Sequence, residues 1–408
     1  MIGRSLCLLL IGLALVACAA ASGREERASA PAASATPAPT LSSTAAPSAT
    51  ATPAPTLSPT AAPSATATPA PPAPTATITP TIAAQWSYPI GQPGHAPGDG
   101  FFIRHGYNVE NTWYNPGYWH TGEDWYAVEG DTAGATVYAV ADGDVVYAGS
   151  NYPGRVVIVK HADDRFSMYG HLDPALAIEQ GQHVIRGARL GTVLRRSDDV
   201  PNHLHFEIRT FLTSAGINGD RPRYGFRCGP QCPPGPGYWP IAAPDLPNAQ
   251  GWRNPTHVIA RRAFPAEPAG ALGEVVVATP PASPGVTLWA QLAEDATPQQ
   301  PIADVALQPG ERFALLAVRA GPEAPQATGA DSYRLWYRVR LPDGREGWAQ
   351  AAVPSDFETG SDGRAATIRF NFYPVSASDV AAQDRDGRIG LHAVRAQAGG
   401  QHDRLAEP

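Results

Sequence analysis

Long apolar runs are scarce in this chain of 408 residues, and the stretch from Leu6 to Val16 is almost unbroken. A finished transmembrane helix needs about 20 predominantly apolar residues. This run is too short for that and has the dimensions of a signal-peptide core. Basic blocks are also missing, and the net charge of −7 is mild for the length. Nucleic-acid binding therefore has no electrostatic support.

The N-terminus predicts an exported and anchored protein. Arg4 supplies a positive start, and the apolar run ends in Leu15-Val16-Ala17-Cys18. Small residues before such a cysteine are the form of a bacterial lipobox, so we expect residues 1–18 to be a lipoprotein signal peptide with Cys18 as the lipidation site. The protein would lie outside the cytoplasm, anchored by lipid to the cell membrane, or to the outer membrane in a diderm. The alternative is an ordinary signal peptide with a cysteine near its cleavage site.

Cysteine is rare, with four residues in the chain. Cys7 lies in the segment that would be removed, and Cys18 would carry the lipid. Cys228 and Cys232 remain, and in an oxidising compartment they most simply form one disulfide across a Gly-Pro turn. A metal-binding pair is the alternative, although no second Cys or His pair lies nearby at zinc-finger spacing.

Composition divides the rest of the chain. Residues 19–85 are almost entirely Ala, Pro, Thr and Ser in near-repeats, which predicts a disordered linker with extended stretches, because such a segment cannot bury a core. From residue 86 to about 262, short apolar stretches such as 156–159 predict β-strands and little helix. The fold class is therefore all-β, with mostly antiparallel strands.

Two histidine motifs in residues 86–262 indicate a metal site. The first is His120-Thr121-Gly122-Glu123-Asp124, where a single strand would place His120 and Asp124 on one side and leave Gly122 without a side chain that obstructs a metal. The second is the segment 203–207, His-Leu-His-Phe-Glu, where His203 and His205 would share a face.

Two histidines and one aspartate make a three-ligand zinc set of the catalytic kind, which leaves one position for water or substrate. A zinc-bound water has a pKa of about 7 and is a nucleophile at neutral pH. A third motif, Tyr169-Gly170-His171-Leu172, adds another histidine. The histidines that are not ligands have the chemistry of a general base and a transition-state stabiliser.

In this order, the motifs resemble those of the LytM/lysostaphin-type zinc endopeptidases. The shared patterns are His-x-Gly-x-Asp at 120–124, Tyr-x-His-Leu at 169–172, Gly-Gln-x-Val-x-x-Gly at 181–187, and His-Leu-His-Phe-Glu at 203–207. The resemblance covers residues 100 to 212 and extends toward Asn254-Pro255.

The resemblance implies a peptidase domain of the duplicated hybrid motif type over residues 86–262. It implies that His120, Asp124 and His205 bind Zn²⁺, that His203 is the general base, and that His171 polarises the scissile carbonyl or stabilises the oxyanion. The substrates of the family are peptide cross-links or bridges of peptidoglycan, which we therefore expect as the partner of this chain, beside the membrane.

The chain departs from the family pattern in two places. Relatives often carry a Gly/Thr/Ser-rich loop before His-Leu-His, whereas residues 195–202 read Arg-Arg-Ser-Asp-Asp-Val-Pro-Asn. Residues 213–250 form a Pro/Gly-rich insertion that could line the groove or be a surface loop. These differences bear on the shape and charge of the groove, and therefore on the substrate.

A second, small β unit is expected over residues 270–358. Leu335 to Val339 and Gly344 to Trp348 resemble bacterial Src-homology-3-like (SH3-like) domains, which implies a small SH3-like β-barrel that binds the cell wall or only acts as a spacer. Residues 359–408 contain a strand pattern at 367–373 and are not assigned to a domain.

Alternatives stay open for the function and for single residues. The chain could be a non-catalytic member of the fold that binds the wall or regulates another wall hydrolase; such relatives have usually lost metal ligands, and none is lost here. It could also cut a secreted protein. Residues outside the motifs get ordinary roles: no ligand partner is expected for His105, and His161 is expected to face solvent. The aromatic residues near the first motif are expected to be either core or substrate rim; they are Trp113, Tyr114, Tyr118, Trp119 and Trp125.

Overall fold

The computed structural model describes residues 85–376, apart from 150–152, 227–228, 230 and 265–270. Every described residue belongs to one unit of the chain, Thr77–Pro408. The predicted signal peptide, Cys18 and almost all of the predicted linker lie outside the described residues. Below, the N-terminal lobe is residues 85–264 and the C-terminal lobe is residues 271–376.

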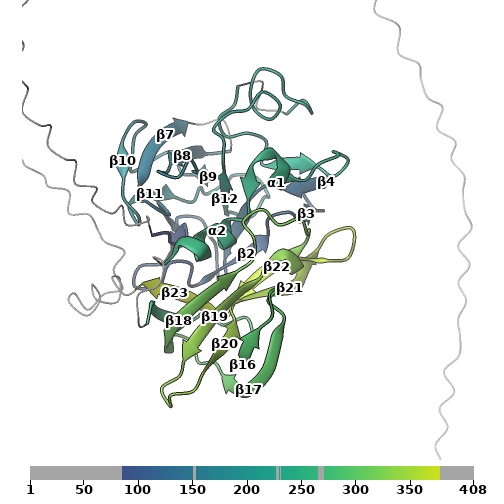
Figure 1. Ribbon diagram of the computed structural model, residues 1–408. Helices are drawn as coiled ribbons and strands as arrows, with labels where there is room; N and C mark the ends of the chain where they lie inside the picture. The colour runs from purple at the N-terminus through teal and green to yellow at the C-terminus, as the bar shows by residue number, and fades with distance from the viewer. Residues whose placement is uncertain (1–84, 150–152, 227–228, 230, 265–270, 377–408) are drawn as a thin grey trace, which may run out of the picture. The chain divides into compact units, whose positions relative to one another are not determined.

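A ten-stranded antiparallel sheet carries most of the N-terminal lobe and continues into the C-terminal lobe (Figure 1). Its order is β10-β7-β8-β9-β12-β5-β2-β22-β21, with β14 paired to β12. The strands are β2 Phe101–His105, β5 Glu123–Ala127, β7 Gly143–Gly149, β8 Arg155–Lys160, β9 Phe166–Leu172, β10 His183–Val184, β12 Leu204–Arg209, β14 Trp252–Arg253, β21 Ala352–Thr359 and β22 Ala365–Phe370.

Two three-stranded sheets complete the N-terminal lobe. One has the order β1-β6-β11 and the other β13-β4-β3. Their strands are β1 Ile90–Gly91, β3 Glu110–Asn111, β4 Asn115–His120, β6 Thr136–Tyr138, β11 Arg189–Thr192 and β13 Tyr238–Pro240. The expected all-β, antiparallel fold class is confirmed.

A seven-stranded antiparallel sheet builds the C-terminal lobe, in the order β17-β16-β20-β19-β18-β15-β23. Its strands are β15 Gly273–Val277, β16 Gly285–Leu292, β17 Pro298–Ala306, β18 Arg312–Ala320, β19 Leu335–Arg340, β20 Glu346–Gln350 and β23 Phe372–Ser376. The strand pattern expected at 367–373 is divided between β22 and β23, which belong to different sheets, so these residues are part of the folded lobe. The SH3-like assignment of residues 270–358 stays a prediction.

Helical structure is short in the described part of the chain. It comprises α1 Pro247–Gln250, α2 Pro255–Arg262 and the 3₁₀ turn η1 Ala330–Ser332. Helix α2 begins where the sequence offers a cap followed by proline, because the Asn254 side chain accepts a hydrogen bond from the His257 backbone N–H. None of the helices described is long and apolar enough to cross a membrane.

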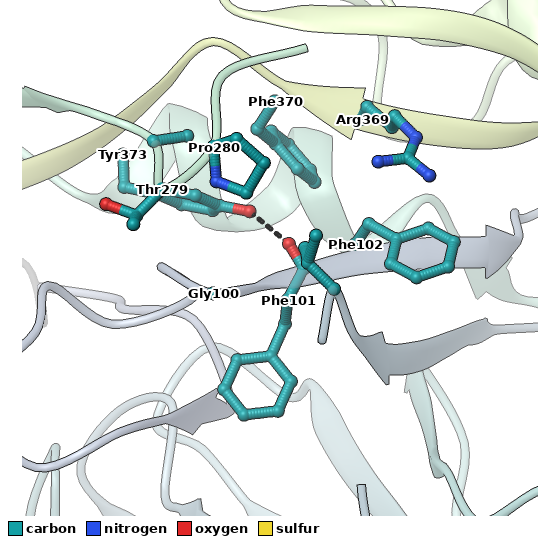
Figure 2. Close-up of a pocket in the computed structure, with 10 residues that line it drawn as sticks. Gly100, Phe101, Phe102, Thr279, Pro280, Arg369, Phe370 and Tyr373 are labelled. Atoms are coloured by element: carbon teal, nitrogen blue, oxygen red, sulfur yellow. Dashed lines mark hydrogen bonds between the residues drawn. The ribbon is translucent and has the colours of Figure 1, made fainter. Parts of the chain in front are cut away.

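Hydrogen bonds join the two lobes along β2 and β22. Ile103 pairs with Ile368, and the Gly106 N–H donates to the Ala366 carbonyl. At one end of this seam the Tyr373 hydroxyl donates a 2.6 Å bond to the Phe101 carbonyl (Figure 2). The cavity beside it is only about 10 Å³, which is close to the smallest volume that holds one water. The seam is therefore closely packed, and the lobes share one sheet and one buried core.

Candidate metal centre

Three buried side chains converge in the N-terminal lobe: His120, Asp124 and His205. The Oδ1 atom of Asp124 lies 3.0 Å from His205 Nδ1 and 3.2 Å from His120 Nε2, and these two nitrogens are 3.1 Å apart. Three ligand atoms in a near-equilateral triangle could hold one metal ion. These are the three residues that the sequence motifs predict.

Strand register brings the three residues together. His205 of β12 pairs directly with Asp124 of β5, and His120 is the last residue of β4. The expectation that His120 and Asp124 share one strand is wrong, because the chain turns at Thr121 and Gly122 and passes from the three-stranded sheet into the ten-stranded sheet.

Gly122 is required for a different reason than the expected one. A Cβ atom at this position would lie 2.4 Å from the Phe206 carbonyl oxygen and 2.9 Å from Glu207 Cγ. The turn after β4 therefore packs against the backbone of β12 so closely that a side chain does not fit. Glycine allows this close approach, which holds His120 beside His205.

Hydrogen bonds orient both histidine rings. His120 Nδ1 lies 3.2 Å from the Gly106 carbonyl, which turns Nε2 toward the cluster. His205 Nε2 lies 3.2 Å from Glu207 Oε1, which leaves Nδ1 for the cluster. Glu207 is itself fixed by the Thr121 hydroxyl at 2.7 Å. A carboxylate behind a ligand histidine fixes its tautomer and raises its basicity.

The charges in the cluster support one another. Burial disfavours the charged form of Asp124, but His120 and His203 outweigh this and hold the pKa of Asp124 well below its usual range. Burial also opposes a charge on His205, yet Asp124 and Glu207 raise its pKa to about 9. The pocket is therefore strongly favourable for positive charge, and a metal cation would supply the same charge.

His203 lies beside the cluster and keeps one nitrogen directed at it. Its Nδ1 is 2.8 Å from the Pro201 carbonyl, which places the ring proton there, and its Nε2 is 3.8 Å from Asp124 Oδ1. The Tyr126 ring stacks on the imidazole, with centroids 5.0 Å apart. Burial lowers the pKa of His203, so the ring is neutral with Nε2 as the basic nitrogen.

His171 completes the group of histidines. It is the residue before the last in β9 and lies in the left-handed region, with φ of 62°, and its ring centroid is 4.7 Å from that of His203. Its Nδ1 is 3.0 Å from the Pro153 carbonyl. Burial, and then the neighbouring His203 and His205, lower its pKa well below the usual range. All five residues from the motifs therefore lie in one site.

The residues around the cluster were harder to foresee. Glu207 follows His205 by two positions in the same strand, so the alternation that joins His203 and His205 could have revealed it. No local pattern connects Tyr126 with His203, because β5 and β12 become neighbours only in the folded sheet. The contact of His105 with Asp124, whose atoms Nδ1 and Oδ2 are 3.6 Å apart, was not expected either.

Both segments that depart from the family pattern line the site. In the insertion, β13 pairs with β4 so that Tyr238 lies opposite His120, and the two rings are 5.2 Å apart. The segment 198–202 borders an open groove of about 370 Å³ together with Tyr126, the residue that stacks on His203. Residues that differ from the family pattern therefore lie beside the five motif residues.

The aromatic residues near the first motif divide between core and surface. Trp125 is fully buried, whereas Trp113 is 63% exposed and Tyr118 is at the surface. Trp113 stacks on Tyr114 at 5.4 Å and carries Arg104 over its ring. Trp125 therefore belongs to the core, and Trp113 is available to a ligand.

Two further expectations concern residues outside the cluster. His161 does not face solvent: it is buried, because it hydrogen-bonds the Asp142 carbonyl and the Ser167 hydroxyl and packs under Trp86. Cys232 is buried and disulfide-bonded. Cys228 lies outside the described residues, so its pairing with Cys232 stays a prediction.

Comparison with known proteins places the site in a family. Residues 118–219, which contain all five motif residues, match the model of peptidase family M23. A protein of Yersinia enterocolitica named Lipoprotein NlpD is 40% identical over 78 residues, which cover 19% of this chain and 78% of that protein. The chain belongs to the M23 peptidase family and is of the LytM type.

Two other relatives match this chain over a stretch of the same length. The cell division protein DipM of Caulobacter vibrioides is 40% identical, and the murein hydrolase activator NlpD of Escherichia coli is 42% identical, each over 78 residues or 19% of this chain. The match spans 13% and 20% of the length of these two relatives. A solved catalytic domain of lysostaphin from Staphylococcus simulans is 27% identical, with 26% of this chain and 77% of that chain covered and a TM-score of 0.23.

Proposed function

We propose that the chain is a zinc-dependent endopeptidase that hydrolyses peptide cross-links or bridges of bacterial peptidoglycan. The observation that carries the proposal is the complete and convergent set of residues: three ligand atoms within 3.2 Å of one another, and two further histidines beside them. The assignment to a peptidase family supports hydrolysis as the reaction.

The ligand atoms fit zinc in type and spacing. Two imidazole nitrogens and one carboxylate oxygen are ordinary zinc ligands with bonds of about 2.0–2.2 Å, and tetrahedral angles then separate the ligand atoms by about 3.3 Å. The observed separations of 3.0–3.2 Å are close to this value. A set of three protein ligands also keeps the fourth position for water or substrate, as catalytic zinc sites do.

The residues divide the chemistry between them. Zinc at His120, Asp124 and His205 would polarise the scissile carbonyl and lower the pKa of a water ligand to about 7. The neutral His203, with its proton on Nδ1, would accept the proton of the attacking water on Nε2 and pass it to the leaving amine. His171 would stabilise the negative charge on the carbonyl oxygen by holding a proton on its second nitrogen. The developing charge favours that protonation, although burial opposes it.

We place the enzyme at the cell envelope. The lipobox at Cys18 and the extended linker of residues 19–85 would hold the catalytic domain, residues 86–262, away from the membrane and within reach of the wall. The names of two relatives, Lipoprotein NlpD of Yersinia enterocolitica and Uncharacterized lipoprotein YgeR of Escherichia coli, support an envelope lipoprotein. The expected disulfide between Cys228 and Cys232 fits the same oxidising location.

Digestion of purified peptidoglycan sacculi by the full chain, followed by mass spectrometry of the released fragments, tests the proposal. We expect new peptide termini from the wild type and none from an Asp124→Ala variant run in parallel. Absence of release by a wild-type protein that holds stoichiometric zinc would contradict peptidoglycan as the substrate. Release by the Asp124→Ala variant would contradict the zinc mechanism.

A second candidate function is activation of another wall hydrolase without catalysis. The observation in its favour is that relatives at 42% identity are named murein hydrolase activators. Activation alone needs no convergent ligand set, so we rank it second. A wild-type protein that neither binds zinc nor releases fragments, yet accelerates a purified wall amidase, would favour this alternative.

A further inference from the structure

The second oxygen of Asp124 faces a histidine that the mechanism does not use. Asp124 Oδ1 belongs to the ligand triangle, and Oδ2 lies 3.6 Å from Nδ1 of His105. His105 is the last residue of β2 and is buried. The other ring nitrogen, Nε2, forms a short ion-pair contact with Oε2 of Glu358.

Glu358 comes from the other lobe. It lies in β21, which pairs with β22, and β22 pairs with β2 in the shared sheet (Figure 1). Its Oε1 accepts a 2.6 Å hydrogen bond from Arg104 Nε, so each carboxylate oxygen has its own partner. This arrangement fixes the carboxylate and keeps it directed at His105.

Arg104 also connects this group to the proposed base. Its guanidinium lies over three aromatic rings, at 5.1 Å from Trp113, 5.2 Å from Tyr126 and 5.7 Å from Phe357. Tyr126 is the residue that stacks on His203. Strand β21 of the C-terminal lobe therefore supplies the Glu358 carboxylate and the Phe357 ring to the surroundings of the metal centre.

We infer that Glu358 of the C-terminal lobe is a positioning residue for the metal centre, acting through His105 on the second carboxylate oxygen of Asp124. A ligand carboxylate binds a metal well when its unused oxygen is held, and such outer partners contribute about 10- to 100-fold to metal affinity. The C-terminal lobe is then part of the metal site as well as a wall-binding module or spacer. The inference rests on the zinc site of the proposed function.

Zinc affinity of the full chain tests the inference, measured by competition with a chromogenic chelator. We expect Glu358→Gln to weaken zinc binding about 10- to 100-fold, His105→Gln to do the same, and the double variant to be no weaker than the worse single one. Non-additivity is expected because both residues act through the same contact with Asp124.

Two matched controls separate positioning from stability and from bulk charge. Glu323→Gln removes another carboxylate of the C-terminal lobe. Glu323 forms ion pairs with Arg262 and Arg165 of the N-terminal lobe and does not contact the cluster. Asp356→Asn removes an exposed charge from the same strand, β21. Both should keep zinc affinity within about twofold, and thermal unfolding of the metal-free variants shows whether Glu358→Gln costs more stability than Glu323→Gln.

Unchanged zinc affinity in Glu358→Gln, or equal weakening in Glu323→Gln, would overturn the inference. The readout is independent of hydrolysis. If the expected affinities are found while sacculi are not cut, the positioning role stands and the proposed activity fails. If the wild type binds no zinc, both fail.

Discussion

Glu123 and Asp124 are neighbours in β5 with opposite surroundings, although both are buried. Asp124 lies among histidines, which hold its pKa well below the usual range against the effect of burial. Burial raises the pKa of Glu123 to about 7, and its hydrogen-bond donors, which include Thr256, Tyr333 and Trp125, only partly oppose this. The ionisation of a buried carboxylate in this protein therefore depends on whether its neighbours can carry positive charge.

The two carboxylates also face different tasks. Asp124 faces His120 and His205, and Glu123 accepts hydrogen bonds from the Thr256 backbone at 3.0 Å and from the Tyr333 hydroxyl at 2.9 Å. Thr256 belongs to the N-terminal lobe and Tyr333 to the C-terminal lobe. Strand β5 thus contributes Asp124 to the candidate metal site and Glu123 to the contact between the two lobes.

Asp124→Asn should have the largest effect, because it removes one of the three proposed metal ligands. The amide keeps the size of the side chain but removes the negative charge that the cluster needs, so we expect loss of stoichiometric zinc and of hydrolysis. Zinc content after dialysis and sacculus digestion measure the two effects. A variant that retains zinc would contradict the ligand assignment.

His203→Ala should leave zinc binding unchanged and slow turnover. The ring is not in the ligand triangle, so zinc content should match the wild type, while kcat should fall by about 10²- to 10⁴-fold, the range for loss of a general base. Steady-state rates on a purified cross-linked muropeptide provide the measurement. A fall of less than tenfold would show that another group takes the proton.

Glu123→Ala should weaken the contact between the two lobes without removing a proposed metal ligand. Three donors would lose their acceptor: the Thr256 N–H, the Tyr333 O–H and the Trp125 indole N–H. Each buried unsatisfied group costs about 1–3 kcal/mol, so the free energy of unfolding should fall by about 4 kcal/mol. Urea unfolding of the metal-free protein measures it. The exposed Glu129→Ala is the control and should change stability by less than about 0.5 kcal/mol.

His257 should give the smallest effect, visible only in acid. It accepts a hydrogen bond from the Arg334 N–H and contacts the Pro322 carbonyl, and burial lowers its pKa to about 4. Because the fold needs the neutral ring, its stability contribution is fully present above about pH 6.5 and is lost as pH falls toward 4. A shift from about 6.5 to about 4 corresponds to roughly 3 kcal/mol.

A His257→Gln variant isolates this effect, because glutamine can replace both hydrogen bonds and does not titrate. Glu123 acts in the opposite sense, since its raised pKa costs stability as pH rises from about 4.5 through 7. The measurement is therefore the difference in unfolding free energy between variant and wild type from pH 4 to 7. Parallel curves would show that His257 does not set the acid limit.

The convergence of the five motif residues was largely predictable from the sequence, because they occur in three short motifs with characteristic spacing. These residues, His120, Asp124, His171, His203 and His205, lie together in the structure, and their roles as metal ligands, base and oxyanion stabiliser stay predictions. Local spacing could not give the turn at Gly122, since that turn is forced by the backbone of β12, a strand far away in the sequence.

The contact between the lobes was not predictable in the same way. His105 and Glu358 have ordinary sequence surroundings, and they meet only because β22 pairs with β2. The expectation that His161 faces solvent is wrong for a similar reason, because its position just after β8 gives no sign of the Trp86 ring that covers it. Interactions between distant strands depend on register, which periodicity does not determine.

The pairing of β2 with β22 also has a consequence for solubility. Phe101-Phe102-Ile103 would leave an apolar strand with unpaired backbone groups at the end of the sheet if the C-terminal lobe were absent, and such an edge is a template for aggregation. With the lobe in place, the last strand is instead β21, which carries Pro354, the acidic residues Asp356 and Glu358, and a register irregularity. These are features by which natural sheets prevent edge-to-edge pairing. The C-terminal lobe thus keeps neighbouring copies of the protein from joining through their sheets.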